Sequence, residues 1–113
     1  VAKLLRRALR NLLENARRYS QGDITVVLQR HDGQAQLSVL DRGPGVPPAL
    51  RERIFEPFYR LPGASERAGG VGLGLALVRS IAQRHNGSVR CEDQPDGSGG
   101  ACFVLRLPLA LTK

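Results

Sequence analysis

The sequence predicts a single α/β (α+β) domain, because helix-like and strand-like patterns alternate along its 113 residues. Apolar residues recur at helical spacing from residue 4 to 16, and a second helical pattern runs from about 71 to 85. Four segments alternate apolar and polar residues as strands do. We place these strands near 24–30, 35–41, 87–93 and 101–107. The length suits one domain with a core of moderate size.

Two asparagines lie one turn apart on the first helix. Asn11, Asn15 and Arg18 fall along one edge of its apolar stripe, so the asparagines face a half-buried crevice. Amide oxygens are hard, neutral ligands suited to Mg²⁺, which takes few protein groups and shares phosphate oxygens, and Arg18 would meet phosphate charge. The helix therefore favours a site for a metal-bound polyphosphate, although ordinary boundary residues of an amphipathic helix remain an alternative here.

The first two strands form a hairpin through Asp32-Gly33, and the second strand ends in an aspartate. Strand parity places Asp41 on the apolar face, where a carboxylate needs a hydrogen-bond donor such as an amide, a water or an adenine amino group. Gly43 and Gly45 follow and permit positive φ and close approach. We expect a short helix over 48–55. An ordinary strand-to-helix turn remains the alternative reading of this motif.

The second long helix is entered through glycines. Residues 61–70 have the small, polar composition of a mobile loop, and Gly70, Gly72 and Gly74 then open the helix, which Asn86-Gly87 closes. Backbone N–H groups and the positive end of the helix dipole at such an entry face an anion, so we expect a phosphate cradle. A P-loop is excluded because lysine occurs only at positions 3 and 113. A dinucleotide fingerprint is excluded because the glycines do not follow a strand.

The strong positive charge, formally +7, raises nucleic-acid binding as a function. Aromatic residues make up only 4%, which leaves few stacking platforms, and no zinc-finger or RNP-type motif is present. Arg6, Arg10 and Arg17 lie opposite the apolar stripe and indicate a solvated or partner-facing surface. We therefore expect no nucleic-acid partner.

The cysteines, the histidines and the start of the chain each support a further prediction. Strand parity puts Cys91 and Cys102 on opposite faces, which predicts two free thiols and a reducing compartment. We expect His31 and His85 to be surface residues. The sequence has neither a long apolar run nor a signal-peptide pattern, so we expect a soluble segment. The helical pattern starts without a cap, as in a fragment of a longer protein.

The four motifs together resemble, in order and spacing, the N, G1, F and G2 boxes of the catalytic ATP-binding domain of bacterial sensor histidine kinases. DNA gyrase B, the large heat-shock chaperone and MutL belong to the same superfamily. The resemblance covers about residues 4–107, and the run from Phe55 to Arg60 with its short lid is similar to the kinase branch. It implies the Bergerat fold, a two-layer sandwich of a mixed, mostly antiparallel sheet with about three helices on one face. The usual N-terminal strand pair is absent.

The resemblance also implies roles for individual residues. In its first two boxes, Asn15 is similar to the Mg²⁺-binding asparagine, and Asp41 to the aspartate that reads the adenine amino group. Their neighbours would contact phosphates or nucleotide: Asn11, Arg18 and Tyr19 on the helix, and Gly43 and Gly45 beside the base.

In the F and G2 boxes, Phe55 and Phe58 resemble hydrophobic anchors of a lid that spans about 60–70. The remaining nucleotide contacts implied by these two boxes are Arg60, Gly70, Val71, Gly72, Leu73, Gly74 and Leu75.

The implied reaction is donation of the γ-phosphate of Mg²⁺·ATP to a histidine on the dimerisation domain of a homodimeric sensor kinase, which then serves a response regulator. Neither histidine of this chain lies in a phosphoacceptor motif. ATP-hydrolysing relatives carry a glutamate where this chain has Asn11, so we expect slow hydrolysis. Glu14 and Asn15 are the candidate catalytic residues: Asn15 through the metal, and Glu14 beside it by orienting or deprotonating the acceptor. Resemblance alone implies a cytoplasmic domain of an inner-membrane protein.

Three alternatives remain open. An ATP-gated clamp or ATPase is disfavoured by Asn11, and a protein-serine kinase of the anti-sigma type is disfavoured by the motif from Phe55 to Arg60. A nucleic-acid-binding module is disfavoured by the ordered glycine motifs.

Overall fold

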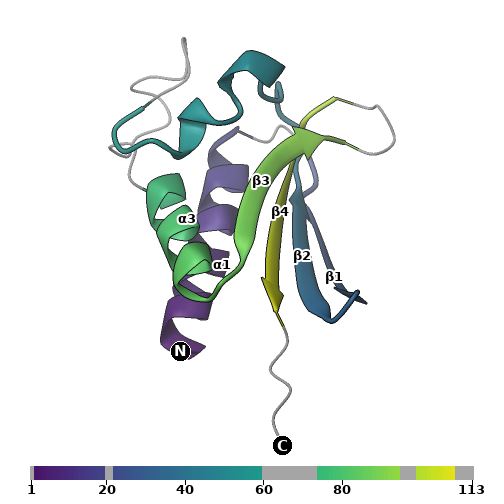
Figure 1. The fold of residues 1–113 in the computed structure, drawn as a ribbon. Helices are drawn as coiled ribbons and strands as arrows, with labels where there is room; N and C mark the ends of the chain where they lie inside the picture. The colour runs from purple at the N-terminus through teal and green to yellow at the C-terminus, as the bar shows by residue number, and fades with distance from the viewer. Residues whose placement is uncertain (1, 20–21, 60–73, 95–98, 109–113) are drawn as a thin grey trace, which may run out of the picture.

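The computed structural model describes residues 2–19, 22–59, 74–94 and 99–108, and these form two layers. One layer is a sheet, and the other consists of two α-helices that lie side by side on one face of the sheet (Figure 1). The helices are α1 (Ala2–Tyr19) and α3 (Gly74–Arg84). The strands are β1 (Thr25–His31), β2 (Gln34–Leu40), β3 (Ser88–Asp93) and β4 (Ala101–Pro108). The α+β class is confirmed, and each expected strand lies within one residue of its predicted bounds.

The sheet has the order β1-β2-β4-β3, and all three neighbouring pairs are antiparallel. The expected mixed sheet is therefore wrong for the strands that the structure describes. The connection through α3 does make β3 run in the same direction as β2. However, β4 lies between these two strands, so they never become neighbours and no parallel pair forms.

The expected short helix over 48–55 is replaced by two single turns of 3-10 helix, Pro48–Leu50 and Arg53–Phe55. Pro47 has extended φ and ψ, and Pro48 occupies the first helical position, where its missing N–H costs nothing. The turns carry the chain across the ends of α3 and the sheet in Figure 1. Within the described residues, the expected three helices are thus two α-helices and this interrupted segment.

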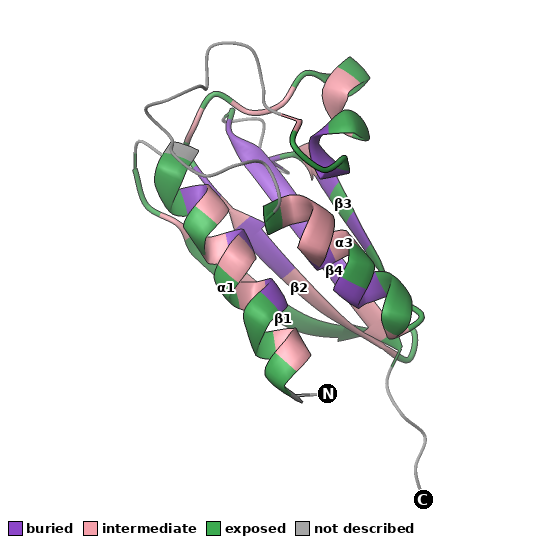
Figure 2. Ribbon diagram, turned by 90° about the vertical axis from the view of Figure 1, so that its left-hand side faces the viewer, coloured by how far each residue is buried: buried purple, intermediate pink, exposed green. Residues whose placement is uncertain are grey.

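The core lies between the helices and the sheet, and Figure 2 shows the buried residues gathered there. α1 contributes Ala8, Leu12 and Ala16, three members of the predicted apolar stripe, and none is more than 1% exposed. Further members from the two layers are Val39, Val78, Ile81, Ala82, Val89, Cys91, Ala101, Phe103 and Leu105, and the 3-10 segment adds Ile54 and Phe55. No helix in the described part of the chain is long and apolar enough to cross a bilayer.

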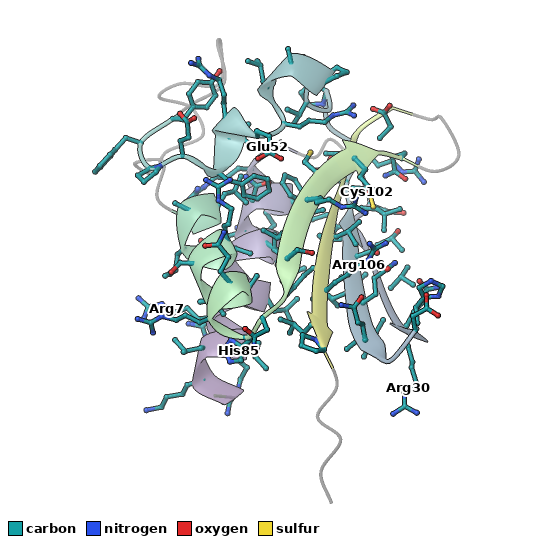
Figure 3. The ribbon with its side chains drawn as sticks, in the orientation of Figure 1. Arg7, Arg30, Glu52, His85, Cys102 and Arg106 are labelled. Atoms are coloured by element: carbon teal, nitrogen blue, oxygen red, sulfur yellow. The ribbon has the colours of Figure 1, made fainter. Side chains whose placement is uncertain are left out.

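The two cysteines lie on opposite faces of the sheet, as strand parity predicted. Cys91 is paired in register with Phe103 and faces the core, whereas Cys102 is paired with Glu92. Figure 3 shows Cys102 and Arg106 on the side of the sheet away from the helices. Both thiols are free and buried, which confirms the expected absence of a disulfide between them.

The turns that set the register follow the predicted chemistry. Asp32 and Gly33 both adopt positive φ in the β1–β2 hairpin, where His31 pairs with Gln34. α3 ends where predicted, because Asn86 adopts φ of 61° and the Gly87 N–H donates to the Ala82 carbonyl at 2.8 Å.

Candidate functional site

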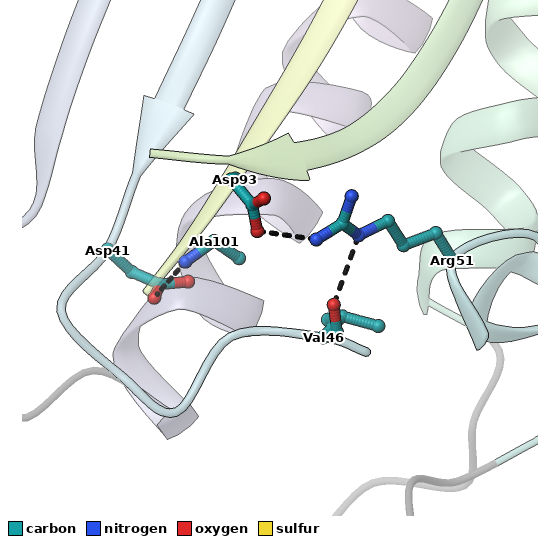
Figure 4. Close-up of polar contacts among 5 residues, drawn as sticks. All are labelled: Asp41, Val46, Arg51, Asp93 and Ala101. Atoms are coloured by element: carbon teal, nitrogen blue, oxygen red, sulfur yellow. Dashed lines mark hydrogen bonds and ion pairs between the residues drawn. The ribbon is translucent and has the colours of Figure 1, made fainter. Parts of the chain in front are cut away.

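Asp41 follows the last residue of β2 and is only 3% exposed. Its Oδ1 accepts hydrogen bonds from the backbone N–H groups of Gly43 at 2.9 Å and of Ala101 at 3.1 Å. Its own N–H donates to the Ala101 carbonyl at 2.9 Å. The predicted need for a donor at a carboxylate on the apolar face is therefore confirmed, and the donors are two backbone amides. Figure 4 shows the contact between Asp41 and the start of β4.

Residues between β3 and β4 contact the backbone carbonyl of Asp41. The buried side chain of Gln94 donates through Nε2 to the Asp41 carbonyl at 2.7 Å. Gly100 has φ of 81°, and a Cβ added there would lie 2.1 Å from the same carbonyl oxygen. Only glycine therefore fits at position 100. The sequence reasoning missed both residues, although the pair Gly99-Gly100 directly before a strand was a visible signal.

The loop after Asp41 is fixed at both of its ends. Its start is held by the hydrogen bond from Gly43 to the carboxylate, and Gly45 then adopts the predicted positive φ, at 77°. Its end is held by Arg51, whose Nε donates to the Val46 carbonyl at 3.0 Å while Nη2 pairs with Asp93 of β3. Arg51 was also missed, because nothing in its local sequence marks it.

The predicted residues on α1 lie at the edge that meets α3. Asn11 donates through Nδ2 to the carbonyl of Gly74, the first residue of α3, at 3.4 Å. Asn15 is half-buried one turn further along. The structure thus brings the first helix and the end of the predicted glycine entry together, although they lie 63 residues apart in the sequence.

Glu14 and Arg18 lie on the exposed surface of the same helix. The Arg18 Nη2 atom is 3.9 Å from Glu14 Oε1, and the side chains are 40% and 52% exposed. A pair this long and this well solvated contributes little to stability. Both charges therefore remain available to a ligand or a partner.

The two phenylalanines of the predicted lid anchor have different environments. Phe55 is 2% exposed and contacts the Phe103 ring edge-on, with 6.2 Å between the centroids. The Arg79 guanidinium lies over the Phe55 ring, 5.5 Å from its centroid. Phe58 is 69% exposed and adopts φ of 68°, which is unusual for a bulky residue. Phe55 thus joins the core, whereas Phe58 does not.

Several predicted site residues lie outside the described residues: Arg60, Gly70, Val71, Gly72, Leu73 and the side chain of Tyr19. The lid and most of the phosphate cradle therefore stay predictions. Gly74 and Leu75 form the first turn of α3, and Leu75 packs partly against the core.

The donor set on α1 fits a magnesium ion that arrives with a polyphosphate. The described part of the chain contains no group of three or more histidine, cysteine, aspartate or glutamate side chains that could hold a metal by itself. Asn11 and Asn15 offer neutral amide oxygens only. Such oxygens complete a coordination sphere whose negative charge comes from phosphates and whose remaining ligands are waters.

Comparison with known proteins identifies relatives over nearly the whole chain. The model of the histidine kinase-, DNA gyrase B-, and HSP90-like ATPase family matches residues 1–111. The sensor histidine kinase CpxA of Escherichia coli K12 is 46% identical over 106 residues, which is 93% of this chain and 23% of CpxA. The chain thus spans about a quarter of the length of such curated relatives.

Solved structures agree with this relationship. The mycobacterial sensor histidine kinase MprB superimposes with a TM-score of 0.83 at 36% identity, over 96% of this chain and 72% of that one. Full-length ShkA in complex with AMPPNP gives a TM-score of 0.81 at 32% identity, over 96% of this chain and 22% of that one.

Proposed function

Because the chain belongs to the histidine kinase-, DNA gyrase B-, and HSP90-like ATPase family, as a histidine kinase ATP-binding catalytic domain, we propose that it binds Mg²⁺·ATP and phosphorylates a histidine of its own sensor kinase. The acceptor would lie on a dimerisation domain of a homodimer, and a cognate response regulator would receive the phosphoryl group next. CpxA is named a sensor histidine kinase, and ShkA was solved with an ATP analogue. The complete protein would then be an inner-membrane sensor with this domain in the cytoplasm.

The buried carboxylate of Asp41 carries the proposal. Among the described residues, both hydrogen bonds to this side chain go to Oδ1, so Oδ2 is the atom that would accept from a ligand. The exocyclic amino group of adenine is a donor of the right kind. Guanine presents a carbonyl oxygen at the equivalent position, which a carboxylate repels. The site would therefore select adenine over guanine, and Gly43 and Gly45 would let the base approach the backbone.

The phosphates would lie between α1 and the start of α3. The N–H groups of the first turn of α3, together with the helix dipole, would face the phosphate oxygens. Asn15, with Asn11 beside it, would hold the magnesium ion, and Arg18 would add positive charge. When bound, the ion neutralises charge that develops on the transferred phosphoryl group. The chain itself would supply positioning, since a γ-phosphate held in line with an acceptor needs little further chemistry.

Phosphoryl transfer to histidine is favoured over hydrolysis by Asn11. A carboxamide cannot take a proton from an attacking water at neutral pH, whereas a neutral imidazole needs no such base. The ATP-gated clamp is disfavoured for this reason. The anti-sigma type of protein-serine kinase is disfavoured by the motif from Phe55 to Arg60, and the relatives described above are sensor kinases. Exposed Glu14 would assist by orienting the acceptor histidine.

The adenine assignment predicts that Asp41→Asn weakens ATP binding while the fold persists. The asparagine Oδ1 still accepts from Gly43 and Ala101, but an N–H₂ group replaces the free oxygen that would accept from adenine. Loss of a hydrogen bond to a charged acceptor corresponds to roughly a 10- to 100-fold weaker affinity. Calorimetric titration with ATP and GTP measures this effect, with Asp32→Asn in the exposed hairpin as the matched control. Unchanged ATP affinity in a folded Asp41→Asn variant would contradict the assignment.

The metal assignment predicts that Asn15→Ala removes the Mg²⁺ dependence of ATP binding. Glu14→Ala should keep that dependence, because its carboxylate is not proposed to bind the metal. Titrations with and without Mg²⁺ compare the two neighbours directly. With a phosphoacceptor domain added, Glu14→Ala should slow transfer. An Asn15→Ala protein with the wild-type metal response, or a Glu14→Ala protein with wild-type transfer, would remove that residue from the mechanism.

A further inference from the structure

Building on the proposed function, we propose that Arg51 is a positioning residue for the nucleotide, which fixes the loop 42–47 against the end of β3. Arg51 lies between the two 3-10 turns and touches neither Asp41 nor the predicted phosphate site in the contacts described above. Its role would be to hold the backbone that follows Asp41 in the conformation that receives the base.

The guanidinium of Arg51 joins two segments that are far apart in the sequence. Its Nε–H donates to the Val46 carbonyl at 3.0 Å, and Nη2 donates to Asp93 Oδ1 at the end of β3. Figure 4 shows the planar group between these two acceptors. The guanidinium is planar and has N–H donors on several edges, so it can bond both partners at once in a fixed geometry.

Each partner of Arg51 is adjacent to a residue that contacts or flanks the Asp41 loop. Val46 directly follows Gly45, which holds the positive φ of the loop. Asp93 directly precedes Gln94, whose amide donates to the Asp41 carbonyl. Arg51 therefore couples the far end of the loop to the strand end that supports Asp41 from behind.

If Arg51 only stabilised the fold, its removal would lower the unfolding free energy as well as the affinity for ATP. The Arg51 side chain is 23% exposed, but Asp93 is 79% exposed, so solvent screens their ion pair and its contribution to the stability of the fold is modest. The loop, in contrast, contains Gly43 and Gly45, and glycine loses the most conformational freedom when it is ordered. A loop that is held in place before binding spares the ligand this entropic cost. Arg51 should therefore affect affinity more than stability.

The test uses variants of Arg51 and Asp93, with a neighbouring ion pair as control. Glu92 adjoins Asp93 on the same strand and pairs with Arg90 at 2.9 Å, but it faces the other side of the sheet, where it is paired in register with Cys102. Glu92→Gln therefore removes a comparable exposed ion pair without touching the loop. Arg51→Lys keeps the positive charge but replaces the planar fork, whose Nε and Nη2 reach Val46 and Asp93 separately, with one ammonium nitrogen.

Calorimetric titration of the 113-residue chain with ATP and GTP, together with urea unfolding, gives the readouts. We expect Arg51→Ala and Arg51→Lys to weaken ATP binding about tenfold and Asp93→Asn about threefold, with a less favourable binding entropy and wild-type unfolding midpoints. The Arg51→Ala/Asp93→Asn double variant should bind no more weakly than Arg51→Ala alone. Glu92→Gln should bind like the wild type.

Wild-type affinity in folded Arg51→Ala and Asp93→Asn proteins would overturn the positioning role while the proposed function stands. A loss of affinity that merely follows a loss of folded protein would overturn it too. If Arg51→Ala does not fold, Asp93→Asn decides alone, because its exposed side chain can be changed safely. Absence of adenine-selective binding in the wild type would overturn the proposed function and this inference together.

Discussion

Gly99 and Gly100 both adopt positive φ, yet only Gly100 lies against Asp41. A Cβ at Gly99 would have no atom within 4 Å, whereas one at Gly100 would lie 2.1 Å from the Asp41 carbonyl oxygen. Alanine variants at these two positions therefore distinguish the cost of backbone strain from the cost of a steric clash. Each alanine variant should lose about 1 kcal/mol of unfolding free energy through its φ.

Gly100→Ala should lose about 1–3 kcal/mol more through overpacking and should also weaken ATP binding, since Asp41 has to move. Urea unfolding and ATP titration of both variants measure the difference. Equal effects of Gly99→Ala and Gly100→Ala would show that the close contact does not matter.

At this scale, sequence reasoning found Asp41 but not the residues that hold it. Alternation along β2 places Asp41 on the apolar face, and that inference needs only the residues of one strand. Gln94 and Gly100 contact the Asp41 carbonyl, and Arg51 pairs with Asp93, so each contact joins residues 42 to 59 positions apart in the sequence. No local pattern encodes such pairings, because they depend on which strand ends meet in the sheet.

Arg79 of α3 makes two contacts with the 3-10 segment. Arg79 stacks on buried Phe55 and lies 3.6 Å from Glu52 Oε1 through Nη1. Stacking on a largely buried ring is worth about 1–2 kcal/mol, whereas a pair with an 89% exposed carboxylate is worth little. The ring contact should therefore dominate.

We expect Arg79→Ala to lower the unfolding free energy by about 1–2 kcal/mol and Glu52→Gln by less than about 0.5 kcal/mol. Urea unfolding of both variants and of the double variant measures how much each contact contributes to the unfolding free energy. If Glu52→Gln lowered it as much as Arg79→Ala, the ring contact would not be the dominant one.

At the level of elements, periodicity predicted the four strands and both long helices, because burial of one face imposes its period on the sequence. The interrupted segment over 48–55 was predicted as one helix. Its prolines do favour a helix start. Arg51 and Glu52, between the two turns, keep helical φ and ψ, and the chain becomes extended at Glu56. A pattern of so few residues cannot distinguish two 3-10 turns from one short helix. The strand order was not encoded locally either, since β4 inserts between β2 and β3.

The whole molecule should become less stable in alkali because of its buried thiols. Burial raises the pKa of Cys91 to about 12, with the Arg51 cation opposing the shift, and burial followed by the Glu92 charge raises the pKa of Cys102. Below pH 9 both thiols are neutral in folded and unfolded chains alike. Above pH 9 the unfolded chain ionises first, so the unfolding free energy falls as pH rises toward 12.

The contribution of Cys91 to this slope is at most about 1.4 kcal/mol per pH unit. Urea unfolding between pH 8 and 11 should therefore show a shallower decline for Cys91→Ala than for the wild type. Identical slopes in the two proteins would rule out Cys91 as a source of alkaline sensitivity.

The central position of β4 has a consequence for protein synthesis. β4 follows every other described element in the sequence, yet it separates β2 from β3 and supplies the amide of Ala101 to Asp41. While the chain is being translated, the β1–β2 hairpin can close, but the sheet has a gap until residues 101–108 leave the ribosome. During that interval the apolar faces of β2 and β3 have no strand between them and are open to chaperones. The hydrogen bonds of the Asp41 carboxylate are therefore completed only near the end of translation of this segment.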